Sequence, residues 1–129
     1  MLKIKILTLL CFILFQVNFT YSQEIVFHKA EFLYGNGTDK VYDLETDQNG
    51  NVYLALSMEK GGSFGNLQLK RSGDHSVYIL KFNSEGLIQY AKEIYGDSEV
   101  AVHSICTDSR GNLYLAGSFK NTCQIGDQL

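Results

Sequence analysis

The sequence predicts an all-β fold built from repeated units. A ten-residue stretch that begins at Thr46 returns at Thr107, 61 residues later, and a repeat at fixed spacing indicates a fold made of similar units. The chain also contains 12 glycines, eight tyrosines and eight phenylalanines but no proline. No stretch has the pattern of a long amphipathic helix, so the composition and the periodicity both favour strands.

The repeat extends well beyond this stretch. Residues 25–68 align without a gap with residues 86–129, and 13 of the 44 aligned pairs are identical. The pair Tyr34 and Tyr95 lies far from the turn, so a shared turn composition does not explain the similarity. The chain therefore contains one unit and part of a second.

Residues 1–22 have the features of an export signal and are predicted to form a signal-peptide helix. Lys3 and Lys5 provide a positive start, and an apolar run follows over residues 6–15. Small residues at positions 20 and 22 place the expected cleavage before Gln23. The run is shorter than the ~20 residues of a membrane span, so we expect no stable membrane span after cleavage, and an uncleaved anchor is the alternative.

Charge excludes one class of partner. Loss of Lys3 and Lys5 with the signal takes the formal net charge from −3 to −5. An acidic chain without a basic patch lacks the electrostatic footprint of a nucleic-acid-binding protein. We therefore expect no nucleic acid as partner. The predicted signal peptide indicates a protein that is secreted or displayed on the outer cell surface. Leu10, which precedes Cys11, is too large for lipoprotein processing.

The alternation of apolar and polar residues predicts short strands in order along the chain. They cover residues 24–33, 41–46, 51–57, 76–82, 87–94, 102–107 and 113–118. Glycines and small polar residues predict turns or loops at 34–39, 47–50 and 83–86. The long connection over 59–73 contains Gly61, Gly62 and Gly65. These glycines form no phosphate-binding pattern, and we interpret the segment as a flexible surface loop.

The repeated stretch is predicted to be a hairpin. Its central glycine can adopt the positive φ that a short hairpin connection needs, and the preceding aspartate can cap the turn by accepting bonds from backbone N–H groups. The structural turn motif consists of Asp47, Gly50 and Asn51 in the first copy and Asp108, Gly111 and Asn112 in the second.

Both faces of the predicted sheet are apolar. Along residues 52–57, Val52, Leu54 and Leu56 alternate with Tyr53 and Ala55. A sheet with one wet face would alternate apolar and polar residues, so both faces are expected to be covered. Four short antiparallel strands per unit, covered on both faces and repeated every 40–60 residues, are typical of a β-propeller blade.

The fourth strand of the unit, over 87–94, is more polar than the others. It contains Gln89, Lys92 and Glu93. Charged residues on an edge strand discourage pairing with other chains. We therefore expect this strand to be the outer edge of the blade.

Two motifs resemble the bacterial seven-bladed β-propeller repeat family. One is the Asp-x-x-Gly-Asn-hydrophobic-Tyr-hydrophobic-Ala pattern, followed in the second copy by Gly117-Ser118, and the other is the segment over 78–86 with the later Tyr95-Gly96. The first copy departs from the pattern at Leu56. The signal peptide resembles those of Bacteroidetes-type secreted proteins. This resemblance implies a secreted or surface propeller, and it transfers no catalytic residue.

The resemblance implies that residues 23–129 form an incomplete β-propeller domain of about one and two-thirds blades. It would contain the last strand of a blade (24–33), a complete blade (41–94) and half of another (102–129). A propeller needs ~4–8 blades to close. We therefore expect an N-terminal fragment whose partners include the remaining blades of the full-length protein, and completion of a ring by several copies is the alternative.

No group of residues has the spacing of a known metal site. Asp47, Asn49 and Asn51 resemble part of a calcium loop, but the glycine and the bidentate glutamate are not at the required positions, and the second copy has Arg110 where Asn49 stands. His28, His75 and His103 lack zinc-ligand spacing. His103 lies on a strand, where packing is its expected role. We predict no metal and no cofactor.

No catalytic residue is predicted. Asp74, His75 and Ser76 have the residue types of a catalytic triad, but triad members that adjoin in sequence do not usually converge in space. Cys106 and Cys123 remain after signal cleavage. Export permits a disulfide, whereas their positions near the turn and beyond the far end of a strand oppose one, so the question stays open.

The function hypothesis follows from export, a repeat scaffold and the lack of a catalytic pattern. The chain is expected to be a secreted or cell-surface module that serves as a non-catalytic binding or structural scaffold, with an unknown protein or glycan as ligand. The alternative is the N-terminal part of a propeller lyase or hydrolase whose active site lies in other blades.

Overall fold

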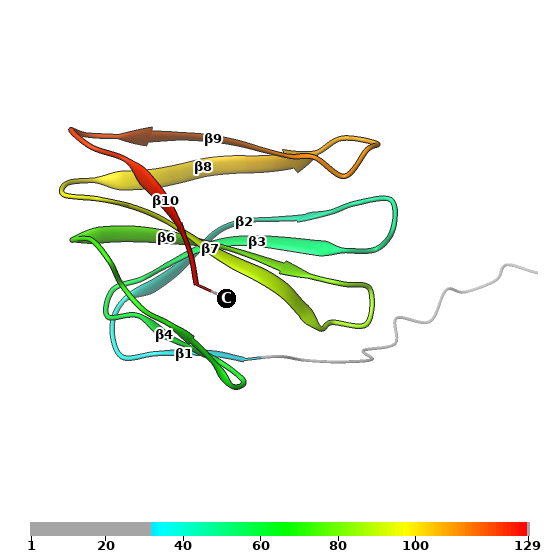
Figure 1. The fold of residues 1–129 in the computed structure, drawn as a ribbon, viewed down its shortest axis with the longest axis horizontal. Coiled ribbons are helices and arrows are strands. Elements are labelled where there is room, and N and C mark those ends of the chain that lie inside the picture. The colour runs from blue at the N-terminus through cyan, green and yellow to red at the C-terminus, as the bar shows by residue number, and fades with distance from the viewer. Residues whose placement is uncertain (1–31, 129) are drawn as a thin grey trace, which may run out of the picture. The chain divides into compact units, whose positions relative to one another are not determined.

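The computed structural model describes residues 32–128. Within this range all ten regular elements are strands and none is a helix (Figure 1), which confirms the all-β prediction. In chain order they are β1 (Leu33–Gly35), β2 (Asp39–Thr46), β3 (Val52–Met58), β4 (Gly62–Phe64), β5 (Leu67–Leu69), β6 (His75–Phe82), β7 (Ile88–Gly96), β8 (Val100–Thr107), β9 (Leu113–Phe119) and β10 (Gln124–Asp127). The predicted signal peptide, and the predicted strand over 24–33 apart from its last two residues, lie outside the described residues.

The largest sheet has five antiparallel strands in the order β10-β7-β6-β3-β2. Four of them, β2, β3, β6 and β7, form a meander along the chain. Two smaller antiparallel sheets, β8–β9 and β1–β4–β5, complete the described part of the fold. The turn between β2 and β3 and the turn between β6 and β7 lie at the same end of the meander, opposite the longer connections (Figure 1).

The segment over 59–73 is a β-hairpin, and the prediction of a flexible surface loop was wrong. Gly62 lies in β4 opposite Gly35, and Leu69 in β5 is 2 % exposed. Phe64 packs edge-on against Phe82, with ring centroids 4.9 Å apart. The glycines suggested a loop, but the apolar alternation between them gives the hairpin side chains to bury, and burial of apolar area stabilises it.

The repeat in the sequence is also a repeat in strand pairing. We call two residues that are 61 positions apart repeat partners. Leu33 pairs with Phe64 across β1 and β4, and their repeat partners Ile94 and Ile125 pair across β7 and β10. The register shift at Tyr42 in β2 likewise recurs at the repeat partner of that residue in β8. Each unit therefore adds a short strand to the outer strand that precedes it.

The prediction that residues 87–94 form an outer edge was wrong for the same reason. β10 pairs with β7, and Lys92 forms an ion pair with Asp127 on β10. β7 also continues to Gly96, beyond the predicted end, since Gln124 pairs with Tyr95. The partner strand lies in the next unit, so the composition of residues 87–94 alone contains no sign of it.

Both faces of the central sheet are covered, as the two-sided apolar pattern predicts. One core contains Tyr53, Ala55, Val77 and Ile79 from the sheet and Val102 and Ile105 from β8. The other contains Leu56, Tyr78, Leu80 and Phe82, packed against Leu33, Phe64 and Leu67 of the β1–β4–β5 sheet. The central sheet is thus the middle layer of three.

Repeat partners in the two units differ sharply in exposure. Tyr53 is 1 % exposed beneath the β8–β9 sheet, whereas its repeat partner Tyr114 is 55 % exposed. The reverse holds on the other side, since Ile105 is 4 % exposed and its repeat partner Leu44 is 56 % exposed. A surface that is buried in one unit is therefore bare in the other.

Candidate functional site

The turn motif forms a closed set of hydrogen bonds around Asp47. Its Oδ1 accepts from the backbone N–H groups of Asn49 and Asn51, each at 2.9 Å, and its Oδ2 accepts from the Asn51 side-chain amide at 2.7 Å and from the Tyr53 hydroxyl at 3.2 Å. Gly50 has φ of 76°. Both carboxylate oxygens are occupied by groups of the turn itself.

The second copy repeats these bonds around Asp108, with donors from Arg110, Asn112 and Tyr114 at 2.8–3.1 Å. Gly111 has φ of 79°. The side-chain amide of the asparagine four residues on is the main cause that lowers the pKa of both aspartates. This chemistry fixes a turn and leaves no open coordination position, so we assign the motif a structural role.

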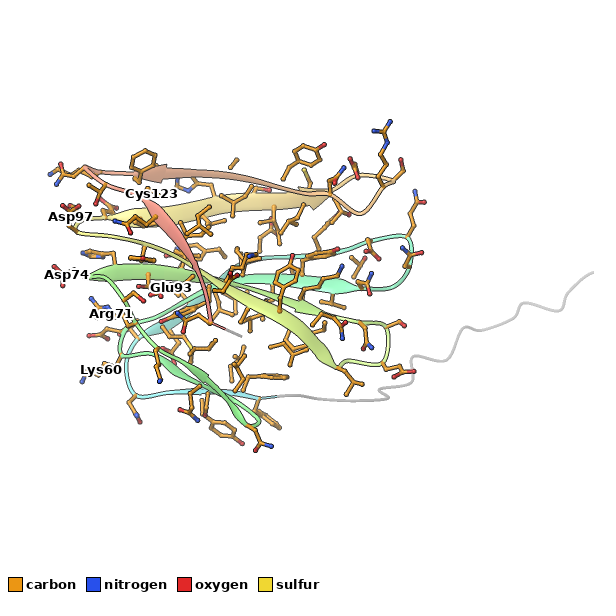
Figure 2. All side chains as sticks on the ribbon, viewed as in Figure 1. Lys60, Arg71, Asp74, Glu93, Asp97 and Cys123 are labelled. Carbon is orange, nitrogen blue, oxygen red and sulfur yellow. The ribbon has the colours of Figure 1, made fainter. Side chains whose placement is uncertain are left out.

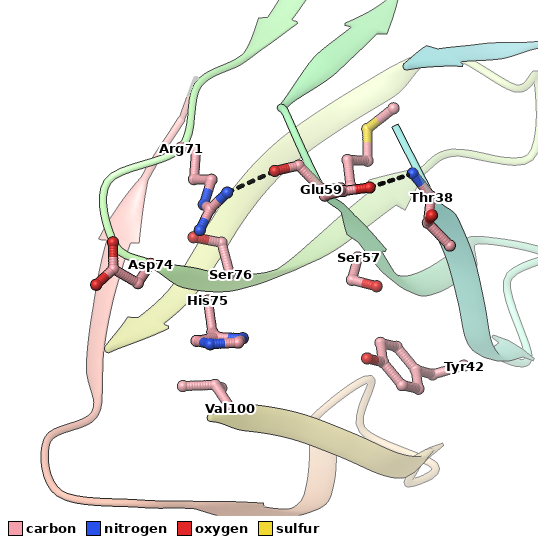
Figure 3. Close-up of a pocket in the computed structure, with 10 residues that line it drawn as sticks. Thr38, Tyr42, Ser57, Glu59, Arg71, Asp74, His75, Ser76 and Val100 are labelled. Carbon is pink, nitrogen blue, oxygen red and sulfur yellow. Dashed lines mark hydrogen bonds between the residues drawn. The ribbon is translucent and has the colours of Figure 1, made fainter. Parts of the chain in front are cut away.

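A groove lies at the end of the central sheet that carries the longer connections, opposite the β2–β3 and β6–β7 turns (Figure 1). The loop-end groove, as we call it, has a volume of about 500 Å³. Its lining residues are Thr38, Tyr42, Ser57, Met58, Glu59, Arg71, Asp74, His75, Ser76 and Val100. Tyr42, Ser57 and His75 point into the same hollow (Figure 3). They come from β2, β3 and β6, while Val100 begins β8, so the groove lies between the central sheet and the β8–β9 sheet.

Three loops around the groove are tied together through Glu59. Its Oε2 accepts from the Thr38 backbone N–H at 2.7 Å, and its backbone carbonyl accepts from the Arg71 guanidinium (Figure 3). Arg71 also donates from Nε to the Gly73 carbonyl at 2.7 Å. The Thr38 hydrogen bonds lower the pKa of Glu59. Because the guanidinium is used to hold two carbonyls, the rim is ordered without a ligand.

Several polar groups in the groove have no hydrogen-bond partner among residues 32–128. They are the hydroxyls of Tyr42 and Ser57, the His75 ring and the Asp74 carboxylate. Tyr42 is placed by the register shift in β2, and such bulges re-aim side chains near functional sites. The Lys40 ammonium lies 4.6 Å from the centroid of the Tyr42 ring and helps to fix it.

The triad-like sequence does not form a triad. His75 and Ser76 project to opposite sides of β6 (Figure 3), as neighbours on a strand do. The Ser76 hydroxyl donates to Glu93 Oε1 at 2.6 Å and is therefore committed elsewhere. β6 begins at His75, one residue before the predicted strand over 76–82, and Asp74, His75 and Ser76 all line the groove without forming a triad.

His103 is exposed, and the prediction that it packs on its strand was wrong. It occupies the bulge position of β8, the repeat partner of Tyr42, and its Nε2 lies 3.2 Å from Ser118 Oγ. Ser118 is in turn the repeat partner of Ser57. The bulge is not the cause, because Tyr42 occupies the same position in β2 and packs against the core; His103 is exposed because no residue of the described range covers its side of the β8–β9 sheet. His28 lies outside the described residues.

Glu93 is a buried charged residue that the sequence did not reveal, and it does not line the loop-end groove. It is fully buried on β7, and its carboxylate accepts from Ser72 N–H and Oγ, from Ser76 Oγ and from Gln128 Nε2 at 2.6–2.8 Å. These donors are distant in sequence. Burial of the Tyr78 phenol, and next the negative charge of Glu93, raise the pKa of Tyr78 to about 12. Figure 2 labels Glu93 nearer the middle of the sheet than Arg71 and Asp74, which lie at the end where the groove is.

Cys106 and Cys123 are both exposed and are not bonded to each other. Among residues 32–128, no three or more histidine, cysteine or acidic side chains are grouped closely enough to hold a metal ion. In the same range, no helix has the length and apolar character needed to cross a bilayer. Comparison with protein families, with curated proteins and with solved structures gave no match.

Proposed function

We propose that this chain is a secreted or cell-surface β-propeller repeat module, a non-catalytic scaffold that binds a protein or glycan. The observation that carries the proposal is the reciprocal exposure of repeat partners. Tyr53 and Ile105 are buried in the contact between the two units, and Tyr114 and Leu44 are bare. Further units stacked on both sides would bury the bare residues in the same way.

Polar contacts between the units support stacking as the role of these faces. Asp43 on β2 accepts from the Ser104 hydroxyl at 3.0 Å and from the Ile105 backbone N–H at 2.9 Å, and Thr107 donates to Glu45 at 3.4 Å. These bonds join the first strand of one unit to the first strand of the next. Strands in that arrangement surround the axis of a propeller.

The shape of the unit supports a binding role for one end. Tight capped turns close one end of the central sheet, while longer connections and the loop-end groove occupy the other. Ligand sites are commonly built from loops that a rigid scaffold positions. Export through the predicted signal peptide would place this end in contact with extracellular proteins or glycans.

Self-association tests the stacking. The chain without residues 1–22 should associate in a concentration-dependent way, because bare apolar faces of this kind mark interaction sites. Leu44→Lys should shift the mass measured by light scattering toward the monomer. Leu87→Lys is the matched control, since Leu87 is 55 % exposed in the turn between β6 and β7, away from the contact between the two units. A wild-type chain that stays monomeric at high concentration would contradict the proposed stacking.

A further inference from the structure

We propose that the loop-end groove binds a neutral carbohydrate. The assignment rests on the binding role proposed above and names the ligand class. The groove holds about 500 Å³, which suits one or two sugar rings, since small-molecule sites commonly span ~300–1,000 Å³. It lies within the described chain, between the central sheet and β8, so no further unit is needed to form it.

The unpaired groups fit a ligand that is both donor and acceptor. The hydroxyls of Tyr42 and Ser57 can donate or accept, Asp74 can only accept, and the His75 ring offers one of each when neutral. Every sugar hydroxyl likewise donates one hydrogen bond and accepts others. A ligand that uses the three groups that point into the hollow, those of Tyr42, Ser57 and His75, therefore needs several hydroxyls on a compact frame.

The charges of the groove oppose the competing ligand classes. Asp74 and Glu59 are two carboxylates on its rim, while the one guanidinium is committed to the carbonyls of Glu59 and Gly73. Those carbonyls are neutral, so the charge of Arg71 remains, and an anion would meet two carboxylates against one guanidinium. A peptide with an apolar anchor would find little apolar surface, because Met58 is 2 % exposed and Val100 is 7 % exposed.

The rim is ordered before binding. Glu59 holds the connection between β1 and β2 through Thr38, and Arg71 holds the connections on either side of the β4–β5 hairpin. A site that is already ordered loses less entropy when it binds. The hollow thus has fixed walls, and the repeat places the pair His103 and Ser118 at the corresponding position of the second unit.

The test is a glycan array probed with the labelled chain without residues 1–22, followed by titration of the best neutral oligosaccharide. We expect binding to neutral glycans, and loss of about tenfold in affinity in Tyr42→Phe and in Ser57→Ala, since each removes one hydrogen-bonding group. Both changes are conservative, and an unchanged thermal midpoint shows that the fold is intact. Tyr114→Phe is the matched control, because it removes a hydroxyl at the opposite end of the unit.

Three outcomes of the glycan experiments would overturn the assignment, and a fourth comes from a peptide array. The first three are no binding to neutral glycans, binding only to acidic glycans that disappears in high salt, and neutral-glycan binding that is unchanged in the Tyr42→Phe, His75→Ala double variant. Selective capture of the chain by an array of peptides would assign the groove to a protein partner instead. None of these results bears on stacking, which the association of Leu44→Lys measures separately.

Discussion

Replacing Glu93 by glutamine tests whether a buried carboxylate stabilises this fold. The carboxylate is 0 % exposed and accepts four hydrogen bonds at 2.6–2.8 Å. Glutamine keeps the shape but replaces one acceptor oxygen by an NH₂ group. If that group faces Gln128, two amide donors meet, and Gln128 cannot simply turn over because its Oε1 accepts from the Lys70 N–H.

The magnitude follows from the number of bonds lost. A hydrogen bond to a charged group contributes about 1.5–3 kcal/mol, and a buried charge carries a desolvation cost that the neutral variant escapes. Because all four donors are short and well placed, we expect the bonds to outweigh that cost. Glu93→Gln should lower the free energy of unfolding by about 2–3 kcal/mol, and Glu93→Leu, which leaves every donor unpaired, by about 3–5 kcal/mol.

Urea unfolding followed by far-ultraviolet circular dichroism measures both changes, because the chain has no tryptophan to report by fluorescence. A drop of 2–3 kcal/mol in a domain of this size lowers the thermal midpoint by roughly 10–20 °C. Glu85→Gln, in the exposed turn between β6 and β7, is the matched control and should unfold as the wild type does. If Glu93→Gln is as stable as the wild type, desolvation dominates and the reasoning fails.

Three further predictions concern the turns, the hairpin and the thiols. The pKa of Asp47 is lowered in the folded chain. The stability that the ionised carboxylate contributes is therefore present above its unfolded pKa and is lost as the pH falls through the folded pKa. Asp47→Asn should lower the urea midpoint at pH 7, and the difference between the variant and the wild type should shrink in acid. Gly61→Ala should lower the free energy of unfolding in urea more than Gly65→Ala. Both glycines have positive φ, but a methyl group at Gly61 would lie 2.5 Å from the Leu69 carbonyl oxygen, while one at Gly65 meets nothing. If both variants lose the same free energy of unfolding, only the positive φ matters. Both Cys106 and Cys123 should react with a thiol reagent in the folded chain without residues 1–22, and a mass two hydrogens low after purification would instead reveal a disulfide.

Local chemistry explains what could be predicted from the sequence. Asp47 and Gly50 form their turn with residues no more than six positions away, so the motif contains all that the turn needs. The same holds for the two-sided apolar strands, because alternation along a single strand states how many of its faces are buried. These features correctly predicted an all-β, antiparallel fold.

Distant partners explain what could not be predicted. Glu93 looks like a surface charge until Ser76, Ser72 and Gln128 are brought to it from 17, 21 and 35 positions away. The loop-end groove likewise draws its side chains from β2, β3 and β6, together with the start of β8. The bulge at Tyr42 depends on the register between β2 and β3, so the residue pattern of either strand alone does not predict it.

The pairing of β10 with β7 has a consequence for the order in which the chain folds. Tyr95 finds its partner Gln124 only after the intervening strands β8 and β9 have been made. During synthesis, one edge of β7 therefore stays unpaired until β10, a segment of the next unit, has been made. Once β10 has paired with β7, backbone hydrogen bonds join the two units, and separating these two strands disrupts both units. Folding of such a chain is expected to proceed as a zipper from the N-terminus, with each new unit locking the one before it.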